Sequence, residues 1–151
     1  MSATDADWMA LAYQQALLAK DRGEVPVGAV VVSEDGRCLA QTHNRVITDT
    51  DPTAHAEVLA VRAAAKVFGN YRLNHAIMYV TLEPCAMCAA ALVHARIARL
   101  VFACRDFKAG AAGSVFNILK GAPLNHAVYI DEGIMQDACN HLLLDFFQEK
   151  R

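Results

Sequence analysis

The segment Pro84-Cys85-Ala-Met-Cys88 constrains this chain more than any other feature, because it places two cysteines three residues apart between two regular elements. The apolar run before it, 76–82, is typical of a strand, and the alanine-rich run 85–95 is typical of a helix. Cysteines at positions i and i+3 lie on one face of a helical turn, so both sulfurs can reach one ion. A helix N-terminus also stabilises the thiolate, which is the form that binds metals. The segment therefore predicts a metal or redox site where a strand turns into a helix.

A second motif, His55-Ala-Glu57, opens the predicted helix 54–68 and can complete such a site. His55 would be the third ligand beside Cys85 and Cys88, which leaves one tetrahedral position open, as in catalytic zinc sites. Zinc lowers the pKa of a bound water to about 7, and Glu57 can take its proton without being a ligand. In this composition an accidental His-x-Glu is expected about 0.2 times and an accidental Pro-Cys-x-x-Cys about 0.004 times per chain. The two motifs together are therefore a specific signal.

The rest of the chain alternates between strands and helices. Apolar runs predict strands over 27–32, 38–42, 76–82, 100–104 and 128–130. Helical spacing predicts helices over 5–22, 54–68, 85–95 and 135–148, and a short helix over 115–119. Strands separated by helices indicate an α/β layered sheet with at least one parallel crossover. With 151 residues and no internal linker, we expect a single domain over 1–151.

The composition predicts a protein of the reducing cytoplasm that does not span a membrane. The longest stretches free of charged residues, 8–19 and 84–95, have 12 residues each, short of the ~18 that a spanning helix needs. The first residues carry Asp5 and Asp7 in place of the basic start of a secretory signal. Five cysteines are an odd number for a disulfide framework, so we expect free thiols. The cysteines outside the motif are expected to be small buried residues: Cys38, Cys104 and Cys139.

The two motifs resemble the signature of the zinc-dependent nucleoside and nucleobase deaminases, His-x-Glu followed by Pro-Cys-x-x-Cys. Further stretches are similar to one branch of that superfamily, the bacterial tRNA-specific adenosine deaminases. These stretches are Asp51-Pro-Thr-Ala-His-Ala-Glu57, Tyr79-Val-Thr-Leu-Glu-Pro-Cys85, Arg105-Asp106, Gly110-Ala-Ala-Gly-Ser114 and Asp145-Phe-Phe147. The resemblance extends over nearly the whole chain from Trp8 onward.

The resemblance implies a three-layer α/β/α fold with a central mixed sheet of about five strands, one Zn²⁺ per subunit, and a homodimer. It implies hydrolytic deamination of adenosine to inosine at the wobble position of a tRNA anticodon stem-loop. Zinc-bound hydroxide would attack C6 of adenine, with zinc held by His55, Cys85 and Cys88 and with Glu57 as the catalytic proton shuttle. The substrate contacts that it implies are Asn44, Ala56, Arg105, Asp106, Lys108 and Phe147, with Phe146 nearby.

Other interpretations of the same residues stay open. A deaminase of free cytosine, cytidine or guanine would use the same chemistry. Cys85 and Cys88 also suit a thiol redox pair, or a structural zinc site with Cys104 or His94 as fourth ligand. The remaining alternatives assign local structural roles: a helix-dipole partner for Glu57, a turn residue for Asn44, and core or dimer contacts for Phe146 and Phe147, which cannot both face the same way on a helix.

The charge pattern bears on the partner. A net charge of -2 argues against binding nucleic acid by bulk positive charge. The charges are uneven, however, because residues 61–125 carry 8 basic and 2 acidic side chains, a net of +6. If these cations cluster around the zinc, one face can bind a polyanion while the whole chain stays slightly acidic.

Overall fold

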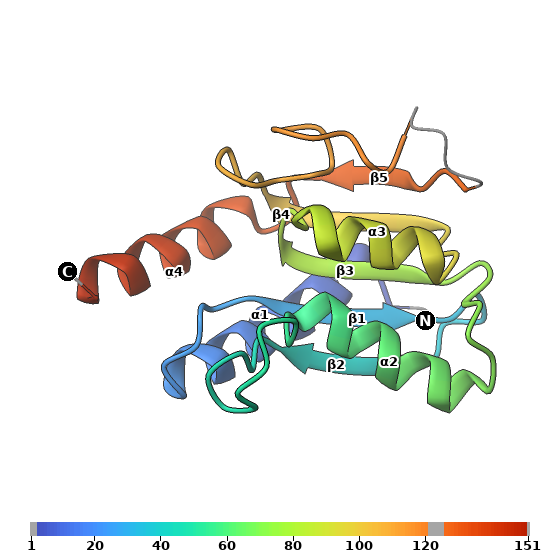
Figure 1. Ribbon diagram of the computed structural model, residues 1–151, viewed down its shortest axis with the longest axis horizontal. Helices are drawn as coiled ribbons and strands as arrows, with labels where there is room; N and C mark the ends of the chain where they lie inside the picture. Colours follow the sequence, from blue (N-terminus) through green and yellow to red (C-terminus); the bar gives the residue numbers. More distant parts are fainter. Residues whose placement is uncertain (1–2, 121–125, 151) are drawn as a thin grey trace.

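A computed structural model, which describes residues 3–120 and 126–150, contains a five-stranded mixed sheet between layers of helices (Figure 1). The strands are β1 (Gly28–Val32), β2 (Cys38–His43), β3 (Ile77–Leu82), β4 (Arg99–Cys104) and β5 (Tyr129–Glu132), in the order β2-β1-β3-β4-β5. β1 pairs antiparallel with β2 and β3, whereas β3 with β4 and β4 with β5 are parallel. The predicted α/β class and mixed sheet of about five strands are confirmed.

Helices cover both faces of the sheet. α2 (Ala56–Phe68) and α3 (Ala86–His94) lie side by side in front of it in Figure 1, and α1 (Asp5–Asp21) lies behind it. α4 (Gln136–Glu149) extends past the sheet, and its end lies near the end of α1, where Lys20 Nζ is 3.7 Å from Glu149 Oε1. The carboxyl ends of β2, β3 and β5 lie at the same end of the sheet, on the left in Figure 1, and α2 and α3 begin there. The residues of both motifs lie at this end of the sheet.

Small residues let α1 lie close against the sheet. Its buried face consists of Met9 and three alanines at helical spacing, among them Ala12 and Ala16. A Cβ added to Gly28 of β1 would lie 2.7 Å from the Ala16 backbone nitrogen, so a larger residue would push the helix away. This close packing fixes the end of α1 and the segment 22–27 that follows it, which forms one wall of the site described below.

The predicted short helix over 115–119 is wrong. The segment is irregular and folds back on the preceding loop, with an isolated bridge between Ala112 and Asn117. The backbone N–H groups of Val115 and Phe116 both donate to Gly110 O at 3.0 Å, and therefore make no helical bonds. Five residues are too few for a stable helix when their N–H groups bond to the preceding loop.

The other predicted elements are present, with ends that differ by one or two residues. The most consequential shift is in the second helix, which begins at Ala56 and leaves His55 as its N-cap residue. One cysteine departs from expectation, because Cys38 is exposed on the edge strand β2, whereas Cys104 and Cys139 are buried as expected. In the part of the chain that the structure describes, no helix has the length and apolar character to cross a membrane.

Candidate metal centre

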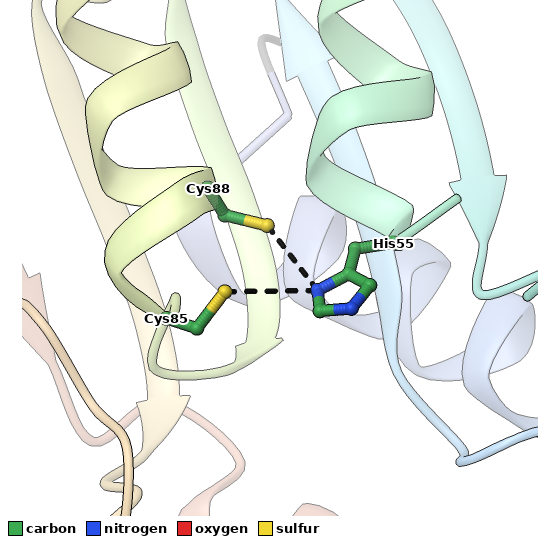
Figure 2. A group of neighbouring side chains, drawn as sticks. All are labelled: His55, Cys85 and Cys88. Atoms are coloured by element: carbon green, nitrogen blue, oxygen red, sulfur yellow. Dashed lines mark hydrogen bonds between the residues drawn. The ribbon is translucent and has the colours of Figure 1, made fainter. Parts of the chain in front are cut away.

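Three candidate ligands lie close together at the end of the sheet where α2 and α3 begin, because each is located at the beginning of one of these helices. His55 is the N-cap residue of α2 and Cys85 is the N-cap residue of α3, and neither side chain caps its own helix. Cys88 follows in the first turn of α3 and is fully buried. Figure 2 shows the three side chains pointing toward one another from the two helices. An N-cap side chain that makes no capping bond is free to bind another group.

The distances between the donor atoms fit one tetrahedral zinc ion. His55 Nδ1 lies 3.7 Å from Cys85 Sγ and 3.5 Å from Cys88 Sγ (Figure 2), and all three atoms lie within 4.8 Å of one another. Zinc bonds of about 2.3 Å to sulfur and about 2.0 Å to nitrogen, at tetrahedral angles, separate such donors by about 3.5 Å. Two thiolates and an imidazole are also ligands that zinc prefers. The three residues can therefore hold one zinc ion and leave one coordination position for another group.

The two thiols hold their protons unequally. The hydrogen bond from Cys88, helped by His55, lowers the pKa of Cys85 to about 4. The same hydrogen bond, with burial and the nearby Glu57 carboxylate, raises the pKa of Cys88. Cys85 is thus a thiolate at neutral pH, the form required of a metal ligand. A redox pair would share this property, so the thiol chemistry alone does not separate the two interpretations.

Glu57 lies two residues after His55, in the first turn of α2, and its side chain is only 4% exposed. Burial raises the pKa of Glu57 to about 7. A carboxyl group that titrates near neutrality can both accept and release a proton in one reaction cycle. A carboxylate that only compensated the helix dipole would not need burial. The position therefore favours proton transfer over a purely structural role.

A cavity of about 620 Å³ opens beside the candidate ligands, and its size is in the range of small-molecule sites. His55, Glu57 and Cys85 line it, together with residues of the segments 23–27 and 44–47. The end of α4 contributes another wall through Phe146 and Phe147, with Lys150 just after the helix, and Leu82, Glu83 and Asp106 complete the lining. Segments far apart in sequence thus enclose one space next to the candidate ligands.

The predicted substrate contacts divide into two groups. Three of them line the cavity: Asn44, Asp106 and Phe147. The other three are absent from its lining: Ala56, Arg105 and Lys108. The Ala56 N–H donates to Asn44 Oδ1 at 2.7 Å, and Arg105 Nη2 lies 2.6 Å from Glu132 Oε1. Lys108 is exposed on the loop after β4. The roles of all six residues stay predictions.

The two phenylalanines face different ways, as expected for neighbours on a helix. Phe146 is 6% exposed and packs into the protein, whereas Phe147 is 49% exposed. Their rings meet edge to face with centroids 5.4 Å apart. Both rings line the cavity, so the core role and the substrate role proposed for this pair are compatible with each other.

Glu83 is a buried residue of the site that the sequence analysis did not single out. Its carboxylate accepts hydrogen bonds from the backbone N–H groups of Asp106 (3.0 Å), Ala112 (2.9 Å) and Ser114 (3.1 Å), and from the Ser114 hydroxyl. Burial acts to raise the pKa of Glu83, but these hydrogen bonds outweigh it and the pKa lies below the usual value. A Cβ at Gly110 would lie 2.5 Å from Asp106 O and would overlap the Glu83 side chain. Glu83 therefore holds the loop that carries Asp106 against the cavity.

Glu24 likewise holds a loop at another wall of the cavity, and the sequence did not predict this role either. It is 1% exposed, and its carboxylate accepts from Ile47 N–H at 3.2 Å and from the N–H and hydroxyl of Thr48, both at 2.7 Å. Burial favours the neutral form, but these hydrogen bonds hold the pKa of Glu24 below its ordinary value. The only sequence signal for either glutamate is its place next to an apolar strand, which is too common to identify a role.

The basic side chains of the segment 61–125 do not all gather at the metal centre. Four of the eight basic side chains of the segment 61–125 lie in the last turn of α2 or after the ends of α2 and α3, away from the candidate ligands: Lys66, Arg72, Arg96 and Arg99. Arg99 is held there by ion pairs with Asp5 at 2.7 Å and Asp131 at 2.8 Å. The loop after β4, which carries Arg105 and Lys108, begins at the end of the sheet where the ligands meet (Figure 1).

Comparison with protein families gives a match over residues 2–104 to the cytidine and deoxycytidylate deaminase zinc-binding region. Among curated proteins, the chain is 44% identical to a tRNA-specific adenosine deaminase of Haemophilus influenzae over 147 residues, which cover 97% of this chain and 85% of the relative. Six further relatives with the same name are 36–43% identical.

Solved structures with two different activities superpose on this chain. A structure from a study of A-to-I editing by tRNA:A34 deaminases at the wobble position of transfer RNA superposes with a TM-score of 0.87 at 42% identity, covering 90% of this chain and 98% of the other. A guanine deaminase from Bacillus subtilis reaches a TM-score of 0.66 at 35% identity, covering 84% of this chain and 85% of the other. A guanine deaminase from Nitrosomonas europaea reaches a TM-score of 0.81 at 22% identity, covering 97% of this chain and 85% of the other, so the same fold occurs with both activities.

Proposed function

The chain belongs to the cytidine and deoxycytidylate deaminase zinc-binding family, and we propose that it converts adenosine to inosine at the wobble position of a tRNA anticodon. The observation that carries this proposal is the juxtaposition of a zinc-compatible triad with a buried glutamate at one cavity. The relatives named tRNA-specific adenosine deaminases, which match almost the whole chain, support adenosine in tRNA as the substrate. Deamination of a free base or nucleoside is the alternative that the experiment below tests.

We assign zinc binding to His55, Cys85 and Cys88, and proton transfer to Glu57. When bound, zinc supplies the activation of water at neutral pH. Glu57 accepts a proton from the attacking water and delivers it to N1 of the adenine ring. It then moves the second proton of that water to the departing amino group. A C6–O bond forms, the C6–N bond breaks, and ammonia leaves, so atoms and charge balance.

The cavity walls suit a base that has left its stack. Val27, Val46 and Leu82 supply apolar surface, and the half-exposed Phe147 stands at the end of α4, where it can stack on a base. Asn44 supplies a polar group at the same cavity. Bases of an anticodon loop are unpaired, so extruding one into the cavity costs less than opening a duplex.

The proposed assembly is a homodimer of single-domain subunits in a cytoplasmic setting. Its support in this chain is the run of exposed apolar side chains that follows β4, namely Phe107 (79% exposed), Val115 (48%) and Phe116 (50%). Light scattering coupled to size exclusion should give the mass of two chains at micromolar concentration. A mass of one chain across the concentration range would contradict the dimer.

The substrate is tested with an anticodon stem-loop RNA that carries adenosine at the wobble position. We expect stoichiometric inosine and ammonia, with kcat/KM at least about 100-fold above that for free adenosine, because binding energy from the surrounding nucleotides is used in the transition state. A matched stem-loop with guanosine at that position should release no ammonia. Ammonia from free cytidine, cytosine or guanine, with none from the adenosine stem-loop, would replace the proposal by the free-base alternative.

A further inference from the structure

We propose that His43, held by Arg22, is a positioning residue that fixes Asn44 at the wall of the reaction cavity. The proposal rests on the proposed function, since it concerns the orientation of a group beside the reacting base. His43 is the last residue of β2 and is 6% exposed, although it lies beside the exposed end of α1. It makes no contact with the candidate zinc ligands that would explain its burial.

The hydrogen bonds of His43 define its tautomer. Arg22 Nη1 lies 3.3 Å from His43 Nε2, and a guanidinium can only donate, so Nε2 must be the acceptor. His43 Nδ1 lies 2.9 Å from the backbone oxygen of Asn44, which can only accept, so Nδ1 must carry the proton. The two contacts therefore fit the tautomer with the proton on Nδ1 and the lone pair on Nε2. A charged imidazole would lose its acceptor and face the guanidinium as a second cation.

Asn44 is anchored at every polar group but one. Its backbone N–H donates to Val27 O at 3.2 Å, and its backbone oxygen accepts from His43. Its side-chain Oδ1 accepts from the Ala56 N–H at 2.7 Å, and Nδ2 donates to Val25 O at 3.2 Å. An amide nitrogen has two hydrogens, and among the described residues no partner takes the second. Because Asn44 lines the cavity, that hydrogen is available to a bound base.

The same bonds tie Asn44 to the reacting groups. Ala56 is the first residue of α2, between His55 and Glu57, so the Asn44 side chain also holds the start of that helix. The bond from His43 stops the Asn44 peptide from rotating about its backbone and carrying the side chain with it. The chain of contacts runs from Arg22 at the end of α1, through His43 and Asn44, to the first turn of α2. His43 and Asn44 are neighbours in sequence, but the two outer links join residues 21 and 12 positions apart, which no spacing pattern identifies.

The activity test uses two substitutions of the same side chain. His43→Phe keeps the bulk and removes both hydrogen bonds, whereas His43→Asn places an amide donor near the position of Nδ1. We expect His43→Phe to lower kcat/KM on the stem-loop about 10-fold, the effect of losing roughly one hydrogen bond, with one zinc still bound per chain. His43→Asn should recover most of that loss. The matched control is His141→Phe, an exposed histidine of α4, which should behave as the wild type.

A double-mutant cycle separates positioning from mere stability. If His43 acts through Asn44, His43→Phe should change kcat/KM by less than about twofold in an Asn44→Ala background. The same 10-fold factor in both backgrounds, or no loss in the wild-type background, would overturn the proposal.

A second measurement does not depend on activity or on tolerance of the phenylalanine. In the zinc-bound wild type, ¹⁵N NMR of the imidazole should show His43 protonated on Nδ1 and bare on Nε2. Arg22→Met should shift the Nε2 resonance without moving the proton. A wild-type His43 protonated on Nε2 overturns this assignment alone, whereas a wild type that makes no inosine from the stem-loop overturns the proposed function.

Discussion

Replacement of Glu57 by glutamine is expected to lower the single-turnover rate of inosine formation by about 1,000-fold or more, the range lost when a general acid–base group is removed. Glutamine has nearly the same shape and can hydrogen-bond, but it cannot take a proton from water and pass it on. Because Glu57 is 4% exposed and is placed beside the ligand set and not in it, zinc content should stay at one per chain. The rate is measured on the stem-loop, and zinc by elemental analysis of the same sample.

Two companion variants make this result specific. Glu34→Gln changes an exposed glutamate of the turn between β1 and β2, and should leave rate and zinc content unchanged. Glu57→Asp keeps the carboxyl group but withdraws it by one methylene, and should fall between the wild type and Glu57→Gln. A Glu57→Gln protein that retains zinc and turns over within tenfold of the wild type would refute the proton-transfer role.

The metal triad could be predicted from sequence because its signals are local. Cys85 and Cys88 are one helical turn apart, and the strand before them and the helix after them were both identifiable from residue pattern. His55 comes from another helix, and its His-x-Glu motif is a weaker signal that became specific only together with the cysteine motif. Parallel pairing of β3 with β4 then follows from the crossover through α3. β2 and β3 run in the same direction because both are antiparallel to β1, so α2 and α3 begin at the same end of the sheet.

The walls of the cavity could not be predicted, because their bonds join residues that are distant in sequence. Glu83 binds backbone groups 23 to 31 residues away, and Glu24 binds groups 23 and 24 residues away. No periodicity records such pairs. The prediction of a helix over 115–119 was wrong for a related reason. Its apolar residues indicated a helix, but the N–H groups of Val115 and Phe116 donate to Gly110 O. The charge summed over residues 61–125 also did not locate the cations, because α2 and α3 run away from the candidate ligands and place four of the eight basic side chains toward the other end of the sheet.

Replacement of Cys88 by serine is expected to remove zinc and reduce deamination to background. A serine hydroxyl stays protonated at neutral pH and is a weaker zinc ligand than thiolate, and Cys88 is fully buried, where a water cannot easily take its place. Zinc should fall well below one per chain after dialysis against a weak chelator. If zinc binds only the folded state and its free concentration is 100 to 1,000 times Kd, it adds about 3–4 kcal/mol to the free energy of unfolding. Removal of zinc should therefore lower the Tm of the wild type by about 5–15 °C.

The Tm of Cys88→Ser should therefore match that of the stripped wild type and should not rise when zinc is added back, whereas the wild type should recover both Tm and activity. Cys38→Ser is the matched control, because Cys38 is exposed on β2 and lies outside the triad. The same samples test the redox interpretation. An air-oxidised wild type with a Cys85–Cys88 disulfide, no zinc, and a Tm indifferent to added zinc would contradict the metal centre. Full zinc occupancy in Cys88→Ser would instead remove Cys88 from the ligand set, since two remaining protein ligands cannot hold zinc against a chelator as three do.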